Sequence, residues 1–157
     1  MITIVGIGNR FRGDDAVGLL MVKSLSGKVG PEIKTVELEG DQTCLLKLMQ
    51  TTDAMIIVDA VQSSAPAGTM FRIDASSEPL PQDFHAFTTH SIDSVQAIEL
   101  ARAMNRLPKK VIVYGITGKD YSYSEKLSPQ MEESIEIVRR NILGEIDHIQ
   151  KNEQTQS

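Results

Sequence analysis

Hydrophobic and polar positions follow two patterns along the chain, one typical of strands and one typical of helices. Short runs rich in β-branched residues predict strands over residues 1–8, 33–38, 54–59, 68–74 and 111–115. Apolar residues spaced by three and four predict helices that begin at Asp14 and at Ser128, and further helices over 44–49 and 92–104. The helical stripe ends at Ile149, and the polar residues 151–157 are expected to be a disordered tail.

The order of these elements predicts an α/β fold. Strands and helices alternate, so we expect a mostly parallel, twisted sheet with helices on both faces, because right-handed crossovers place them there. Residues 54–59 are apolar up to a final carboxylate, as in a central parallel strand. Residues 68–74 follow a turn too short for a crossover helix, which favours an antiparallel edge strand. A chain of 157 residues has room for one domain, over residues 1–150.

Composition and charge narrow the possible functions. Sixteen Lys and Arg against 21 Asp and Glu give a formal net charge of −5, so nucleic acid is not expected as a partner. No run approaches the roughly 18 apolar residues of a membrane span, and the first residues resemble a strand more than a signal peptide. A single cysteine, Cys44, excludes an internal disulfide. We therefore expect a cytoplasmic protein without a membrane partner. We also expect it to be a monomer.

Two common catalytic motifs are missing. Gly6 and Gly8 follow the first strand as in a dinucleotide-binding loop, but Phe11 stands where the third glycine of that fingerprint would be. A phenylalanine there would block the close approach of the backbone to a pyrophosphate. The G-x-S-x-G motif of serine hydrolases does not occur either.

Asp15, Asp59 and His90 are the candidate functional residues, because each is expected near the carboxyl ends of strands, where open α/β sheets bind ligands. If Asp14 caps the first helix, Asp15 is left to project toward the strand ends. Asp59 closes an apolar strand, where a buried carboxylate is costly unless it is paired or coordinated. An isolated histidine such as His90 is more often merely exposed at a helix start. Together the three would suit a borderline divalent cation such as Ni, Zn, Cu or Fe.

Several motifs, spread over most of the chain, carry a resemblance to a known family. They are GIGNRFRGDDAVG at residues 6–18, IIVDA at 56–60, TTHSIDSVQAIEL at 88–100, VIVYGI at 111–116 and KLSP at 126–129. The chain resembles the nickel-iron hydrogenase maturation endopeptidases, which trim a C-terminal extension from the hydrogenase large subunit after nickel insertion. The resemblance implies a three-layer α/β/α sandwich with a five-stranded sheet, and the large-subunit precursor as partner.

The resemblance also implies roles for individual residues. Asp15, Asp59 and His90 match the metal-binding positions of the family, and the two aspartates would also be catalytic. Gly40 matches a glycine in the loop after the second strand, where Asp41 replaces a second glycine of many relatives, so these two are expected to contact substrate. The implied metal is nickel supplied by the precursor, not a resident cofactor. Nickel would relieve the like-charge repulsion in an empty pocket, so only loaded precursor would dock productively.

The resemblance leaves the cleavage mechanism open. The family is catalogued with the aspartic peptidases, but the chain lacks their paired Asp-Thr/Ser-Gly motifs. A carboxylate could act as general base on a water, or nickel could polarise the scissile carbonyl or the water. We favour metal-assisted hydrolysis with a carboxylate base. Two alternatives remain. A chaperone that checks nickel without cutting would use the same three ligands, and a metal-dependent hydrolase of small substrates would hold its metal tightly.

Overall fold

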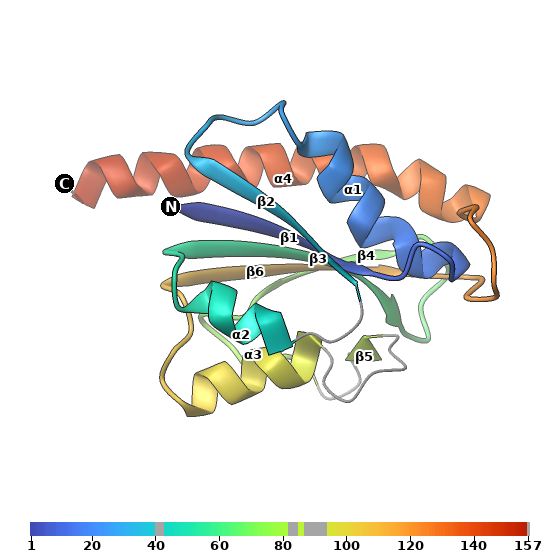
Figure 1. Cartoon of the computed structure of the whole chain (residues 1–157), viewed down its shortest axis with the longest axis horizontal. Helices are drawn as coiled ribbons and strands as arrows, with labels where there is room; N and C mark the ends of the chain where they lie inside the picture. Colours follow the sequence, from blue (N-terminus) through green and yellow to red (C-terminus); the bar gives the residue numbers. More distant parts are fainter. Residues whose placement is uncertain (40–42, 82–84, 87–93, 157) are drawn as a thin grey trace.

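In the part of the chain that the structure describes, five long strands form one twisted sheet (Figure 1). The structure is a computed structural model and describes residues 1–39, 43–81, 85–86 and 94–156. The strand order is β2-β1-β3-β6-β4. The strands are β1 (Ile2–Gly8), β2 (Ile33–Glu39), β3 (Ala54–Gln62), β4 (Met70–Asp74) and β6 (Lys110–Thr117).

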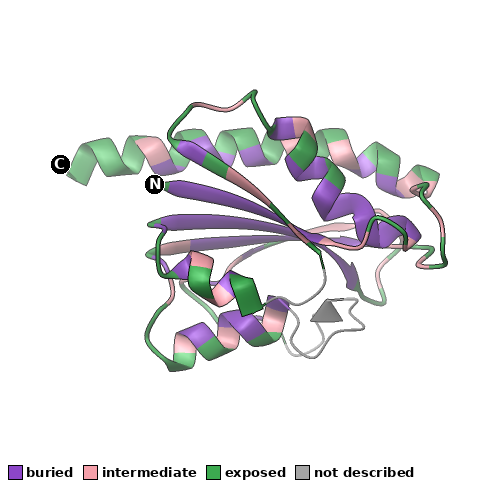
Figure 2. Cartoon of the chain, in the orientation of Figure 1, coloured by how far each residue is buried: buried purple, intermediate pink, exposed green. Residues whose placement is uncertain are grey.

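The predicted sheet is confirmed in its main features. β2, β1, β3 and β6 are mutually parallel, and β4 lies antiparallel to β6 at one edge. β3 lies at the centre, and eight of its nine residues are buried, as its continuous apolar run indicates (Figure 2). A further short strand, β5 (His85–Ala86), pairs antiparallel with the end of β3. Two residues are too few to show a pattern, so the sequence did not predict it.

Helices cover both faces of the sheet and make the three predicted layers. The helical elements are the 3-10 turn η1 (Gly13–Ala16), α1 (Val17–Leu25), α2 (Thr43–Met49), α3 (Ser94–Ala103) and α4 (Pro129–Gln156). α1 and α4 lie on one face, and α2 and α3 lie on the other (Figure 1). Alternate residues of β3 face the two layers, so that Ile56 and Val58 pack with α1 and α4 while Met55 and Ile57 pack with α2 and α3.

The end of α4 differs from the prediction. The sequence predicted a disordered tail over residues 151–157, but α4 continues to Gln156, with residues 151–156 exposed (Figure 2). These residues have no glycine or proline that would stop a helix, and Lys, Glu and Gln favour helix. The apolar stripe marks the part of α4 that packs on the sheet, not the part that is helical. None of the helices that the structure describes combines the length and apolar composition needed to cross a membrane.

Two glycines let α1 begin directly against the strand ends. A Cβ atom on Gly18 would lie 2.3 Å from the carbonyl oxygen of Val58, and one on Gly6 would lie 2.1 Å from the carbonyl oxygen of Gly18. Both distances are far below van der Waals contact, so only glycine allows this approach. This close packing of α1 against β1 and β3 holds η1, which immediately precedes α1, against the carboxyl ends of the two strands.

We expect Gly18→Ala to lower the free energy of unfolding by roughly 1–3 kcal/mol, because the new methyl group meets backbone atoms that cannot rotate away. Gly144→Ala is the matched control. Gly144 lies inside α4, and nothing beyond the neighbouring helix backbone comes within 4 Å of the place that a Cβ atom would take. This change should therefore raise the free energy of unfolding by up to about 1 kcal/mol. Urea unfolding measures both, and a Gly18→Ala variant as stable as Gly144→Ala would contradict the close crossing.

Candidate active site

The register of the sheet separates β1 from β3 beside Asp59. β1 pairs with β3 as far as Gly6 and Val58, and beyond this point it pairs with β2 alone. The chain proceeds from β1 to β2 on one side, and from β3 to strands on the other side. This is a topological switch point, the place where open α/β sheets bind ligands. Asp59 is the first residue of β3 past the shared pairing.

Asp15 lies in η1, at the carboxyl end of β1. Its amide donates to the carbonyl of Arg12 at 3.1 Å, and its carbonyl accepts from the amide of Asn9 at 3.2 Å. A Cβ atom on Gly8 would lie 1.8 Å from the same carbonyl, so glycine is needed for this contact. The Asp15 side chain is buried, and its Oδ1 atom accepts no hydrogen bond from any residue that the structure describes.

Burial raises the pKa of Asp15 to about 7. The positive charge of Arg12 and a hydrogen bond from the Asn9 amide act in the opposite direction but do not cancel the cost of desolvation. Near neutral pH, the carboxyl is therefore present in both protonation states. A cation bound beside it would favour the ionised state, whereas the empty site favours the protonated one.

Asp59 is buried inside β3. The sequence predicted that it would close the strand, but β3 continues to Gln62 because the backbone pairing with β6 runs on to Val61 and Thr117. The Asp59 carboxylate lies on the α2 and α3 side, where its Oδ2 accepts a hydrogen bond of 2.8 Å from the hydroxyl of Ser94 at the start of α3. The residue is 1% exposed, so the structure confirms that this carboxylate is buried.

Tyr121 is a site residue that the sequence analysis missed. Its hydroxyl donates to the carbonyl of Val61 at 2.9 Å and accepts from the amide of Gly118 at 3.1 Å. Burial raises the pKa of Tyr121 to about 12, and the negative charges of Asp15, Asp14 and Asp59 add to the increase. The phenol therefore stays protonated, and it lies near enough to these carboxylates for their charges to act on it. Residues 116–127 lack hydrophobic periodicity, so no pattern pointed to it.

The hydrogen bonds of Asp14 differ from those that the sequence predicted. The sequence predicted a helix cap, but neither η1 nor α1 has a side-chain cap bond. The fully buried carboxylate instead accepts hydrogen bonds from the amides of Lys119 at 2.7 Å, Asp120 at 3.0 Å and Ser128 at 2.7 Å, and from the Ser128 hydroxyl at 2.8 Å. The hydrogen bonds of Asp14 thus hold the segment between β6 and α4 against η1.

Three predicted site residues, Gly40, Asp41 and His90, lie outside the described residues, and their roles stay predictions. Within the described part of the chain, no three His, Cys, Asp or Glu side chains are grouped so that they could hold a metal ion.

The described residues on either side of His90 both lie at β3. Ala86 pairs with Val61, and Ser94 bonds to Asp59.

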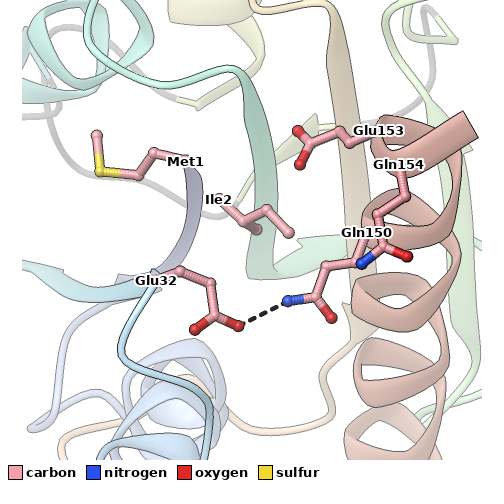
Figure 3. A pocket seen from close by; sticks show the side chains of 6 residues that line it. All are labelled: Met1, Ile2, Glu32, Gln150, Glu153 and Gln154. Carbon is pink, nitrogen blue, oxygen red and sulfur yellow. Dashed lines mark hydrogen bonds between the residues drawn. The ribbon is translucent and has the colours of Figure 1, made fainter. Parts of the chain in front are cut away.

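A pocket at the other end of the sheet does not have the composition of a catalytic site (Figure 3). It lies at the amino end of β1, and Gln150 of α4 donates across it to Glu32 at 2.7 Å. Neither an imidazole nor a nucleophilic side chain is among the residues that line it, which are Met1, Ile2, Glu32, Gln150, Glu153 and Gln154.

Comparison with known families identifies the architecture around this site. The HycI family model, described as hydrogenase maturation protease, matches residues 31–145, which is well over half of the chain. The chain belongs to the hydrogenase maturation protease family. The matched range includes Asp59, whereas Asp15 precedes it.

Individual relatives in this family of peptidases agree with the assignment. The hydrogenase 2 maturation protease of Escherichia coli K12 is 27% identical over 91% of this chain and 88% of its own length. The hydrogenase expression/formation protein HupD of Thiocapsa roseopersicina is 23% identical over 85% of this chain, which spans 62% of that longer relative.

Solved structures of maturation proteases share the fold. The hydrogenase maturating endopeptidase HybD of E. coli superposes with a TM-score of 0.76 at 21% identity, over 94% of this chain and 92% of that one. The [NiFe] hydrogenase maturation protease HycI of Thermococcus kodakarensis KOD1 superposes with a TM-score of 0.71 at 22% identity, over 90% and 88%. The predicted α/β/α sandwich with an antiparallel edge strand is therefore the fold of this family.

We expect Asp14→Asn to lower the free energy of unfolding by roughly 2–4 kcal/mol, because an amide cannot accept all the hydrogen bonds that converge on Asp14. Hydrogen exchange at the amides of Lys119, Asp120 and Ser128 should accelerate. Ser128→Ala is the control, since it removes the hydroxyl but keeps the amide bond and should cost about 1 kcal/mol. Equal stability of the two variants would refute the role given to Asp14.

The raised pKa of Asp15 predicts a pH-dependent stability of the metal-free protein. Folding shifts the pKa from 3.8 to about 7, so the free energy of unfolding falls as the pH rises through this window. Asp15→Asn is neutral throughout and should match the wild type near pH 4. At pH 8 it should exceed the wild type by up to about 4 kcal/mol. Urea unfolding at both pH values tests this, and a difference that does not change with pH would contradict it.

Proposed function

We propose that this chain is an endopeptidase that removes the C-terminal extension from a nickel-iron hydrogenase large-subunit precursor once nickel has been inserted. The observation that carries the proposal is the placement of two buried carboxylates, Asp15 and Asp59, around the switch point of a maturation-protease fold. The proposal includes a cytoplasmic monomer that acts without nucleic acid. Nickel arrives with the precursor, so it is part of the substrate.

The state of Asp15 supports recognition of a metal-bearing substrate. Its Oδ1 atom is buried without a hydrogen-bond donor from the described residues, an arrangement that costs free energy until a ligand supplies a positive partner. Asp59 and His90 would complete a set of two carboxylates and an imidazole, which suits nickel. Nickel-free precursor would leave the buried carboxylate uncompensated and would therefore dock poorly.

The loop after β2 would contact the precursor beside this set. Glu39, the last residue of β2, pairs with Gly8 at the end of β1. Gly40 and Asp41 follow Glu39 directly in the sequence. We assign these two residues to substrate binding.

The chemistry proposed is hydrolysis with a carboxylate base. The base takes a proton from a water, the water oxygen attacks the scissile carbonyl carbon, and the carbon–nitrogen bond breaks as the leaving amine gains a proton. Asp15 or Asp59 would act as the base. Nickel in the substrate would polarise the carbonyl or the water. Tyr121, protonated and bonded to Val61, would hold the end of β3 in place.

The test is to mix the purified protein with nickel-loaded and nickel-free precursor and to measure intact masses. We expect only the loaded precursor to lose a C-terminal peptide. Asp59→Asn and His90→Ala should slow cleavage by a factor of about 100 or more while the thermal unfolding midpoint stays close to that of the wild type. Glu153→Gln, a change of an exposed carboxylate at the far end of α4, should leave the rate unchanged.

Other outcomes would replace the proposal. Retained binding without loss of mass would make the protein a nickel-checking chaperone. Cleavage of nickel-free precursor, together with a metal held tightly by the isolated protein, would indicate a metalloenzyme with its own cofactor. Full activity of His90→Ala would remove His90 from the site.

A further inference from the structure

Two exposed aromatic side chains are brought together beside η1. Among the described residues, Phe11 and Tyr123 are the aromatic side chains that expose more than half of their surface, at 54% and 80%. The segments that carry them are joined through their backbones. The amide of Ser124 donates to the carbonyl of Phe11 at 2.9 Å, and the amide of Gly13 donates to the carbonyl of Ser124 at 2.9 Å. The two rings therefore project from one connected piece of backbone.

Arg12 belongs to the same surface. Its guanidinium carbon lies 4.1 Å from the centroid of the Tyr123 ring, and its Nη2 donates to the Tyr123 hydroxyl at 3.2 Å. Arg12 forms no ion pair with any residue that the structure describes. Its charge also acts on the carboxyl of Asp15. We call Phe11, Arg12 and Tyr123 the aromatic ridge, and it borders the candidate active site.

The aromatic ridge has the composition of a binding surface. Aromatic residues and arginine are enriched at the centres of protein interfaces, and Tyr and Arg are enriched among the residues that carry most of the binding energy. Other strongly exposed apolar residues in the described chain are aliphatic or Met, and several are on helices, as Leu143 is on α4. The backbone bonds and the stacked guanidinium hold the ridge in one arrangement before binding, which lowers the entropic cost of association.

We propose that the aromatic ridge binds the segment of the precursor that flanks the scissile bond. This inference rests on the proposed function. The segment would place an apolar side chain against the rings of Phe11 and Tyr123 and a carboxylate against Arg12. A guanidinium stacked on an aromatic ring keeps its donor edge for a bidentate carboxylate. In a chain with a net charge of −5, this cation, which forms no ion pair with a described residue, offers local complementarity to an acidic segment.

Single substitutions of the rings test the proposal in the cleavage assay. Phe11→Ala and Tyr123→Ala should each raise KM about tenfold and leave kcat within a factor of about two, because the ridge contacts bound substrate and transition state alike. Tyr123→Phe keeps the ring under Arg12 and should retain most of the affinity. The backbone bonds of Phe11 and Ser124 do not depend on these side chains, so the unfolding midpoint should not change.

A double-mutant cycle tests the carboxylate. Replacing the acidic residues that flank the cleavage site of the precursor with their amides should weaken binding to the wild-type protein and have little effect on Arg12→Met. Leu143→Ala, which removes an exposed apolar side chain of α4, is the control and should leave KM unchanged. Additive effects of the two changes would overturn the assignment of Arg12.

The outcomes separate this inference from the proposed function. Cleavage of loaded precursor by the wild type establishes the peptidase activity, whether or not the aromatic ridge binds the precursor. Unchanged KM in both ring variants, or a loss of kcat at unchanged KM, would overturn the ridge as a docking surface. If the wild type does not cut, the proposed function fails. The Kd of the same variants for labelled precursor, measured by fluorescence anisotropy, then shows whether the aromatic ridge binds the precursor.

Discussion

The candidate site depends on one buried carboxylate that is not expected to take part in chemistry. Asp14 accepts hydrogen bonds from Lys119, Asp120 and Ser128, and these bonds compensate for its burial. They hold the segment between β6 and α4 against η1. Because that segment carries Tyr121 and Tyr123, both the wall of the site and the aromatic ridge are positioned by the same few bonds.

Asp14 and Asp15 are neighbours in sequence with opposite environments. Asp14 is surrounded by donors, whereas Asp15 is buried with one oxygen that no described residue partners. The first arrangement stabilises the fold, and the second costs free energy, which appears as the raised pKa of Asp15. Such a local cost, supported by well-bonded surroundings, is typical of a site that awaits a ligand.

Most of the fold could be predicted because it follows from short-range pattern. The apolar run before Asp59 indicated a central strand, and the short turn before β4 indicated an antiparallel edge. The predictions were wrong where a strand or helix continues beyond its apolar residues. β3 continues past Asp59 because backbone pairing does not require apolar side chains, and α4 continues past Ile149 because an exposed helix needs no apolar stripe.

The sequence by itself determined the order of strands and helices, the motifs of the family, and the candidacy of Asp15 and Asp59. Only the tertiary structure decided which of two adjacent aspartates supports the fold, that Tyr121 bonds to the end of β3, and that Phe11 and Tyr123 share one surface. The physical reason is the range of the contacts. Periodicity records which face of an element is buried, whereas these contacts join segments 60 or more residues apart, and the irregular segments among them carry no periodic signal.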